Sequence, residues 1–364
     1  MEKQKRNEKK LLCCFGITLF LFLGAAALTV FLTDPFFHYH KPWFGLPAVQ
    51  DNHQYQIPGA LAHLDYDGLL VGSSVSMSIN TGTLDAKFGS RTIKAVENTA
   101  PASTLKYYIE SALENRSLKY IFYGMDVFSF YCWPGEVPQG SAQTAYLTND
   151  NPFDDVNYLW NGEVLMKRVP DLLKISRDGG YDEGMAYQFN RHKNCGPEYV
   201  LPGYDPNESL FFPGSYEESW KRENLEQLER LVRENPQTEF VFFIPAYSVL
   251  WWYASHNVGM FYDYMDTLKL SMQTLLAYDN VRMYATDFNA SSVITDLYLY
   301  TDKIHGGSDV TELMADAIGE AAQEITLDNY EAQVDKLTEV VERFKEKYET
   351  EGDAFLYLPG GMQM

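Results

Sequence analysis

Residues 68–74, GLLVGSS, are the stretch on which the predicted fold depends. Three apolar residues between two glycines are typical of a short strand buried on both faces, and the Gly-Ser-Ser that follows indicates a sharp turn. Further segments of the same kind follow along the chain. They are the other predicted strands, at 93–97, 118–124, 239–245 and 281–285.

Segments with helical spacing lie between these strands. Residues 103–114 follow the second strand, residues 217–234 precede the fourth, and residues 262–276 follow it. Strands that alternate with helices are typical of an α/β layered fold with a mainly parallel sheet. Five such strands predict a flavodoxin-like, doubly wound sheet.

The interval 130–220 interrupts this alternation. It is rich in Gly, Pro, Asn, Asp and Tyr, with one helical pattern near 164–175. A long insertion in an α/β domain more often shapes a binding surface than a core. Beyond the last strand, we expect one helix with Ser308 as its N-cap and a charged amphipathic helix over 327–349.

The N-terminus predicts a membrane anchor. Residues 1–10 carry a net charge of +3, and residues 11–33 contain no charged side chain. A helix of that length spans about 34 Å, and the hydrocarbon core of a bilayer is roughly 30 Å thick. A cleaved signal peptide is the alternative, with residues 25–27 (AAA) as the cleavage site. The apolar run continues past these alanines, which favours an uncleaved anchor.

The charge distribution predicts which side of the membrane the chain occupies. The residues after the first ten carry 24 basic and 48 acidic side chains, a net charge of −24. By the positive-inside rule the N-terminus lies in the cytoplasm and the rest of this plasma-membrane protein lies outside. An acidic chain with a pI near 4.7 also argues against nucleic acid as a partner, because phosphates are bound by Lys and Arg.

The predicted organisation therefore has five parts. They are a cytoplasmic tail (1–10), a transmembrane anchor (11–33), a juxtamembrane connector (34–58), an α/β domain (59–326) and a C-terminal charged helix and tail (327–364). With 46% hydrophobic residues, the chain can bury a large core. Four cysteines are too few for a disulfide framework, and Cys132 and Cys195 can either form a bridge outside the cell or stay free.

Two short motifs at opposite ends of the α/β domain carry residues suited to acyl transfer. Ser74 follows the first strand, where the turn exposes it at the carboxyl edge of the sheet. Its alcohol needs a base, and a neutral imidazole serves near pH 7. His305 supplies one, and Asp302, three residues earlier, can orient the ring and stabilise the imidazolium.

With these two motifs the sequence resembles the SGNH (GDSL-type) hydrolase superfamily over roughly residues 60–325. Residues 72–74 (GSS) stand where the family has G-D-S, which makes Ser74 the nucleophile. Asp302 and His305 match the family's Asp-x-x-His. The single span is similar to the branch with the D-alanyl transfer protein of teichoic-acid modification and the SGNH partners of membrane-bound O-acyltransferases.

The blocks that form the family's oxyanion hole differ here. Residues 98–101 (NTAP) occupy the region of the usual Gly, so Ala100 is the expected backbone donor. Asp126, in Gly124-Met125-Asp126, stands where the family has Asn. An ionised carboxylate accepts hydrogen bonds and donates none, so Asp126 either orients another group or stays protonated.

Two further groups of residues are candidates for a site. Trp251 and Trp252 follow the fourth strand and can either form a substrate surface for a sugar or acyl chain or pack in the core. Asp34, His38 and His40 are metal-ligating residue types, but juxtamembrane aromatics and histidines more often pack at the headgroup boundary. No metal and no cofactor is predicted.

The sequence therefore predicts an extracytoplasmic, membrane-anchored serine esterase or O-acyltransferase that forms an acyl-enzyme on Ser74. Its expected substrate is an acyl ester of a cell-envelope polysaccharide or glycopolymer, and a membrane-bound O-acyltransferase is an expected partner. The alternative is a non-catalytic, SGNH-like scaffold in a polysaccharide modification or export complex, which the altered oxyanion blocks favour.

Overall fold

The computed structural model describes residues 2–135, 144–149, 151–190, 193–208, 216–286 and 291–360. Its internal contacts divide the chain into two compact units. The first, called the anchor unit after its predicted role, comprises Met1–Leu64 and Pro138–Glu183, and the second, the α/β unit, comprises Asp65–Val137 and Gly184–Met364. This division differs from the predicted organisation, in which the whole interval 130–220 belonged to the α/β domain.

The α/β unit contains a six-stranded sheet in the order β2-β1-β3-β4-β5-β6. The first five strands are parallel, and β6 is antiparallel to β5. Their bounds are β1 Gly68–Gly72, β2 Thr92–Val96, β3 Tyr120–Gly124, β4 Glu239–Ile244, β5 Val281–Ala285 and β6 Glu324–Ile325. The predicted mainly parallel α/β sheet is confirmed, but the predicted number of five strands is wrong. The sixth has two residues, too few to show a strand pattern in the sequence.

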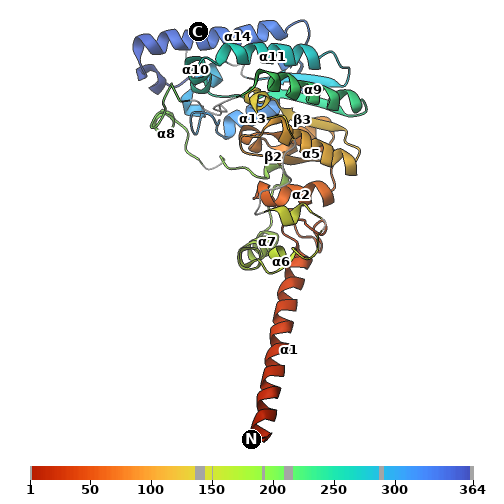
Figure 1. The fold of residues 1–364 in the computed structure, drawn as a ribbon. Helices are drawn as coiled ribbons and strands as arrows, with labels where there is room; N and C mark the ends of the chain where they lie inside the picture. The colour runs from red at the N-terminus through yellow and green to blue at the C-terminus, as the bar shows by residue number, and fades with distance from the viewer. Residues whose placement is uncertain are drawn as a thin grey trace. The chain divides into compact units, whose positions relative to one another are not determined.

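The strands near the centre of the sheet are buried because helices pack against them (Figure 1). Every residue of β1 is buried, which explains why this strand is a continuous apolar run. Every residue of β2 is buried too, including Lys94. Each of α5, α9, α11 and α14 packs against the next, and α4 packs against α13. The helices are α3 Ser74–Met77, α4 Thr81–Phe88, α5 Ala102–Asn115, α8 Pro197–Val200, α9 Glu218–Glu234, α10 Val249–Asn257, α11 Phe261–Leu275, α12 Ser291–Thr295, α13 Ser308–Ala317 and α14 Tyr330–Glu351.

The predicted helices at 103–114, 217–234, 262–276 and 327–349 correspond to α5, α9, α11 and α14. The N-cap of α13 is corrected by one residue. Gly307 is the cap, and Ser308 is the first helical residue. The Gly307 amide donates to the Leu299 carbonyl at 2.7 Å, so the backbone of the preceding loop fixes where this helix starts. Short 3-10 helices complete the chain: η1 Val127–Tyr131, η2 Ala145–Leu147, η4 Glu183–Met185, η5 Leu297–Leu299, η6 Ala321–Gln323 and η7 Ala354–Tyr357.

The anchor unit begins with α1, Glu2–Thr33. Within it, Gln4–Thr33 is long and apolar enough to cross a membrane, and only 6% of its most apolar window is buried. The other helices of this unit are α2 His53–His63, α6 Val156–Leu159, the π-helix η3 Val164–Arg168 and α7 Val169–Asp178. The last two lie where one helix was predicted near 164–175. Their apolar side chains form a small core with the end of α1, composed of Val30, Phe36, Tyr146, Leu147, Tyr158, Val164 and Val169.

Candidate active site

The turn from β1 into α3 presents Ser74. Gly72 ends the strand, the Ser73 hydroxyl caps α3, and Ser74 is the first helical residue. A Cβ at Gly72 or at Gly124, the last residue of β3, would lie 2.3 Å from Ser76 Oγ. No side chain larger than hydrogen fits there, so the two glycines let α3 pack directly on the ends of two adjacent strands.

A narrow loop between η5 and α13 holds the aspartate and the histidine. Tyr300 and Gly306 form an antiparallel bridge across it. Inside the loop, Asp302 Oδ1 accepts the backbone N–H groups of Ile304 at 2.9 Å and His305 at 2.8 Å. These local hydrogen bonds place the carboxylate of Asp302 beside the ring of His305.

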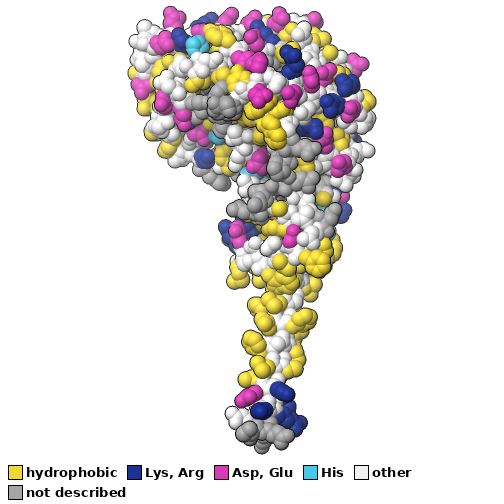
Figure 2. Space-filling view, viewed as in Figure 1, with side chains coloured by type: hydrophobic (Ala, Val, Ile, Leu, Met, Phe, Trp, Pro, Cys, Tyr) yellow, Lys and Arg dark blue, Asp and Glu magenta, His cyan; other side chains and the backbone are white. Residues whose placement is uncertain are grey.

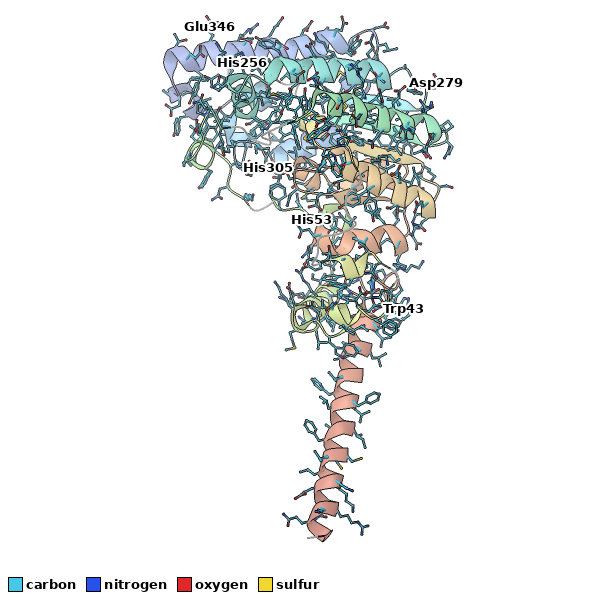
Figure 3. All side chains as sticks on the ribbon, viewed as in Figure 1. Trp43, His53, His256, Asp279, His305 and Glu346 are labelled. Atoms are coloured by element: carbon cyan, nitrogen blue, oxygen red, sulfur yellow. The ribbon has the colours of Figure 1, made fainter. Side chains whose placement is uncertain are left out.

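The two segments meet in the α/β unit, where Figure 3 labels His305. The distance from Ser74 Oγ to His305 Nε2 is 2.8 Å, across 231 positions of sequence. His305 Nδ1 lies 2.9 Å from each oxygen of Asp302. A proton on Nδ1 directed at the carboxylate leaves the lone pair of Nε2 to accept the serine hydroxyl. The structure thus brings together the three residues predicted to act as nucleophile, base and orienting carboxylate.

The electrostatics of this group keep Asp302 ionised. Burial works to raise the pKa of the Asp302 carboxyl, but the hydrogen bonds and charge of His305 and the backbone amides outweigh it and lower the pKa to about 2. The carboxylate is therefore negative at neutral pH, where it stabilises a positive charge on the ring of His305. Ser74, the predicted nucleophile, is 8% exposed and lies just below the surface.

Asp126 supports the turn that carries Ser74. One of its oxygens accepts the Ser73 backbone N–H at 3.0 Å, and the other accepts the hydroxyl of Tyr247. The side chain is fully buried. Burial raises the pKa of Asp126 to about 6, although the hydrogen bonds from Tyr247 and Ser73 act to lower it. Of the two predicted roles, orienting another group matches these contacts, since both oxygens act as acceptors.

Ala100 lies in the connection between β2 and α5 and is fully buried. β2 is the neighbour of β1 in the sheet. The residue before it, Thr99, has a φ of 51°. Left-handed backbone is rare for a β-branched residue, and such strain is often found at functional sites. The role of Ala100 as an oxyanion donor stays a prediction.

Trp251 and Trp252 are corrected from a substrate surface to core packing. Their exposed fractions are 0% and 1%, so neither indole offers a surface to a ligand. Trp251 stacks on Tyr247 with ring centroids 4.3 Å apart, and Trp252 meets Trp251 edge-on at 4.6 Å. From the sequence alone, aromatic residues that follow a strand fit either an exposed substrate surface or the core. Only their burial in the structure distinguishes the two. Their effect on the site is indirect, through the position of Tyr247 behind Asp126.

A segment that no sequence motif predicted packs on the loop that holds Asp302 and His305. Phe189 meets the His305 ring edge-on at 5.1 Å, and Asn190 Nδ2 donates to the Gly306 carbonyl. Lys94, buried in β2, donates to the Met77 carbonyl at the end of α3 at 2.8 Å and to the Ala186 carbonyl at 2.7 Å. A lysine in an otherwise apolar strand was the one signal that could have pointed here, because buried lysines require partners.

Near the end of α1, the side chains of Asp34 and His40 contact backbone groups, whereas the ring of His38 contacts the carboxylate of Asp155. Asp34 accepts the N–H groups of His38, Tyr39 and His40, and His40 contacts the carbonyls of Lys41 and Phe31 at 2.7 Å. Within the described ranges, no group of three or more His, Cys, Asp or Glu side chains is placed to hold a metal ion. Cys132 and Cys195 are both free.

No protein-family model matches the chain, and a search of curated proteins finds no match.

Proposed function

We propose that this chain is a membrane-anchored serine esterase or O-acyltransferase of the SGNH type, acting on acyl esters of a cell-envelope polysaccharide or glycopolymer. The observation that carries the proposal is the continuous hydrogen-bonded path from Ser74 Oγ through His305 to Asp302. The order of the first five strands, β2-β1-β3-β4-β5, is also the order of flavodoxin-like sheets, which supports the resemblance to SGNH hydrolases.

The first half-reaction transfers the acyl group to the enzyme. His305 Nε2 takes the proton of the Ser74 hydroxyl while Ser74 Oγ attacks the carbonyl carbon of the ester, giving a tetrahedral intermediate. Asp302 stabilises the imidazolium. When the intermediate collapses, the bond from the carbonyl carbon to the alkoxy oxygen breaks, and the imidazolium returns its proton to the leaving oxygen. The product is an ester on Ser74.

The second half-reaction releases the acyl group. Water or a sugar hydroxyl gives its proton to His305 Nε2 and attacks the acyl-Ser74 carbonyl, and the serine oxygen leaves with the proton from the ring. Water as acceptor makes the protein a hydrolase, and a sugar hydroxyl makes it a transferase. A membrane anchor favours transfer, because it holds the site beside a donor supplied from the membrane.

The developing oxyanion requires hydrogen-bond donors near Ser74. The backbone N–H of Ser74, the first residue of α3, and that of Ala100 are the groups we assign. With Asp126 engaged by Ser73 and Tyr247, the side-chain donor that the family usually supplies at this position is missing. We therefore expect a slower enzyme than a typical esterase unless a partner completes the hole.

The proposed setting is the outer face of the plasma membrane. The first ten residues, with their net charge of +3, stay in the cytoplasm, and α1 crosses the bilayer. A membrane-bound O-acyltransferase in the same membrane is the proposed donor of the acyl group. The net charge of −24 beyond the N-terminus favours a neutral polysaccharide over a polyanionic polymer.

A non-catalytic scaffold is the second proposal, and Asp126 is the observation that favours it. A side chain that accepts from two groups cannot stabilise an oxyanion. A scaffold with this fold would keep the turn and the loop in place without turning over an ester.

A fluorophosphonate probe distinguishes the two proposals. The full-length protein is expected to be labelled, and Ser74→Ala is expected to lose the label, because the probe reacts only with an activated serine. Ser78→Ala is the matched control, since Ser78 is also buried near the site and its hydroxyl has no hydrogen-bond partner within the described part of the chain. An unlabelled wild type, with cells carrying Ser74→Ala unchanged in envelope acylation, would contradict the enzyme and support the scaffold.

A further inference from the structure

Part of the anchor unit contacts α1 within its apolar run. The indole N–H of Trp160 donates to the Leu23 carbonyl at 2.9 Å, and both α6 and η3 pack against α1. Leu23 lies ten residues before the end of α1 at Thr33. At 1.5 Å per residue this is about 15 Å, or half of a hydrocarbon core. If α1 spans the membrane, the Trp160–Leu23 contact therefore lies at the level of the hydrocarbon core.

Buried hydrogen bonds fix this arrangement. The hydroxyl of Tyr158 in α6 donates to Asp34 at 2.8 Å and accepts the Phe36 backbone N–H at 3.0 Å. Asp34 directly follows α1, and Tyr158 is fully buried. A buried tyrosine bonded to a buried carboxylate holds α6 at one height along α1. The buried core of this unit thus holds α6 in place beside α1.

The elements beside α1 expose apolar side chains. Val156 in α6 and Met166 in η3 are 49% and 76% exposed, and Phe153 and Trp160, which flank α6, are 84% and 43% exposed. We call these four residues the 153–166 surface. Figure 2 shows hydrophobic side chains along α1 and on the part of the anchor unit next to its C-terminal end. Exposed apolar groups gathered in this way mark a surface that binds protein or lipid.

Some of the charged groups in this segment have polar partners. Asp155 contacts His38 Nε2 at 3.1 Å and accepts the Tyr39 hydroxyl at 3.0 Å. Glu163 forms an ion pair with Arg168 at 3.1 Å. Pairing lowers the cost of removing charges from water. These contacts lower that cost for Asp155, Glu163 and Arg168. Asp154 and Lys167 form no ion pair within the described residues, so their charged groups stay at the headgroup level when the apolar side chains insert.

We infer that the 153–166 surface inserts into the lipid leaflet that surrounds the C-terminal half of α1, an inference that rests on the proposed membrane anchoring. Trp43, labelled in Figure 3, meets Phe31 of α1 edge-on at 5.9 Å. Tryptophan is typical of the membrane–water boundary. Phe31 lies eight residues beyond Leu23, about 12 Å along the helix. With Trp43 at that boundary, Trp160 lies on its lipid side.

The test measures lipid contact at single positions of the full-length protein. Cys13, Cys14, Cys132 and Cys195 are replaced by Ser, and one cysteine is then introduced at Met166 and labelled with the fluorophore NBD. The protein is reconstituted into vesicles of phosphatidylcholine and phosphatidylglycerol with brominated acyl chains. We expect loss of most of the NBD fluorescence at Met166→Cys relative to unbrominated vesicles. Phe153→Cys is a second, independent position that should behave alike.

Two reference positions make the outcome unambiguous. Phe20→Cys, at a residue of α1 that is 76% exposed, reports the anchoring itself, and Leu270→Cys, 50% exposed on α11, reports an apolar position of the α/β unit. Quenching at 20, 153 and 166 with none at 270 supports the inference. Quenching at 20 alone overturns it while leaving the anchor intact, and favours a protein partner on this surface. Absence of quenching at 20 refutes the anchoring and the inference together.

Discussion

Ser74, His305 and Asp302 form a hydrogen-bonded path. One of its two contacts depends on local structure and the other on tertiary packing. Local bonds in a loop of a few residues set the Asp302–His305 contact, whereas the Ser74–His305 contact of 2.8 Å depends on the packing of the whole α/β unit. Asp126 adds a buried carboxyl directly behind the nucleophile turn. The reactivity of Ser74 should therefore depend on residues that never touch a substrate.

Asp126 leads to a prediction on stability. Its pKa is raised to about 6 in the folded protein, above an unfolded value of about 3.9. Its contribution to the free energy of unfolding is therefore fully present below about pH 4 and is lost as the pH rises through 6. Asp126→Asn cannot ionise and should lack this loss. Between these limits, wild type should lose up to about 3 kcal/mol relative to the variant.

Thermal unfolding of both full-length proteins in detergent, at several pH values, measures this difference. The variant should start with a constant penalty of about 1–3 kcal/mol, because an amide cannot accept from both Ser73 and Tyr247. Stability curves that stay parallel across the range would show that Asp126 does not titrate there.

At the scale of elements, the candidate site depends on β2 and the segment at 184–190 as much as on the loop that holds Asp302 and His305. Lys94 joins the end of α3 to Ala186, and Phe189 then packs on His305. One buried ammonium thus connects the helix that carries Ser74 to the segment that contacts His305.

We predict that Lys94→Met slows fluorophosphonate labelling of Ser74 by about tenfold or more, because a displacement of about 1 Å between reacting groups is enough for such a loss. The labelling rate is measured below the unfolding midpoint of the variant, with saturation by probe measured separately. We expect the maximal rate to fall and half-saturation to change little. Lys106→Met, which removes a half-exposed lysine paired with Glu110, is the matched control. Equal labelling of Lys94→Met and wild type would limit Lys94 to a structural role.

At the scale of the whole molecule, charge separates the two ends of the chain. The N-terminal ten residues are basic and the remainder carries a net charge of −24. At physiological salt the screening length is about 8 Å, so such a charge repels polyanions mainly near the protein surface. Substrate preference should therefore respond to ionic strength.

We predict that deacylation of a neutral acylated polysaccharide is nearly independent of salt, while the rate on a polyanionic acylated polymer rises as salt increases. Release of the free acyl group, followed over a series of salt concentrations, measures both rates. Ser74→Ala serves as the blank. A rate on the polyanion that increases steeply at low salt would contradict the preference for neutral polymers, because it would require attraction between protein and polymer.

Much of the fold followed from the sequence because its signals are local. The apolar runs at β1 and β4 and the helical spacing of α5, α9 and α11 are patterns within a few residues of sequence. The anchor helix is predicted for the same reason, since length and hydrophobicity decide it. The Asp302-x-x-His305 pair is likewise local.

Tertiary structure alone decided the remaining features. The two-residue β6 has no pattern of its own and forms only because β5 offers an edge. Trp251 and Trp252 are buried by neighbours distant in sequence, and Tyr247 meets Asp126 across 121 positions. Likewise, residues 153–166 reach the apolar run of α1 only through the core around Tyr158. On its own, the sequence determined the local elements and the chemical groups that they carry. Long-range packing determined which of them meet, because the chain gains burial energy from contacts whose partners no local pattern specifies.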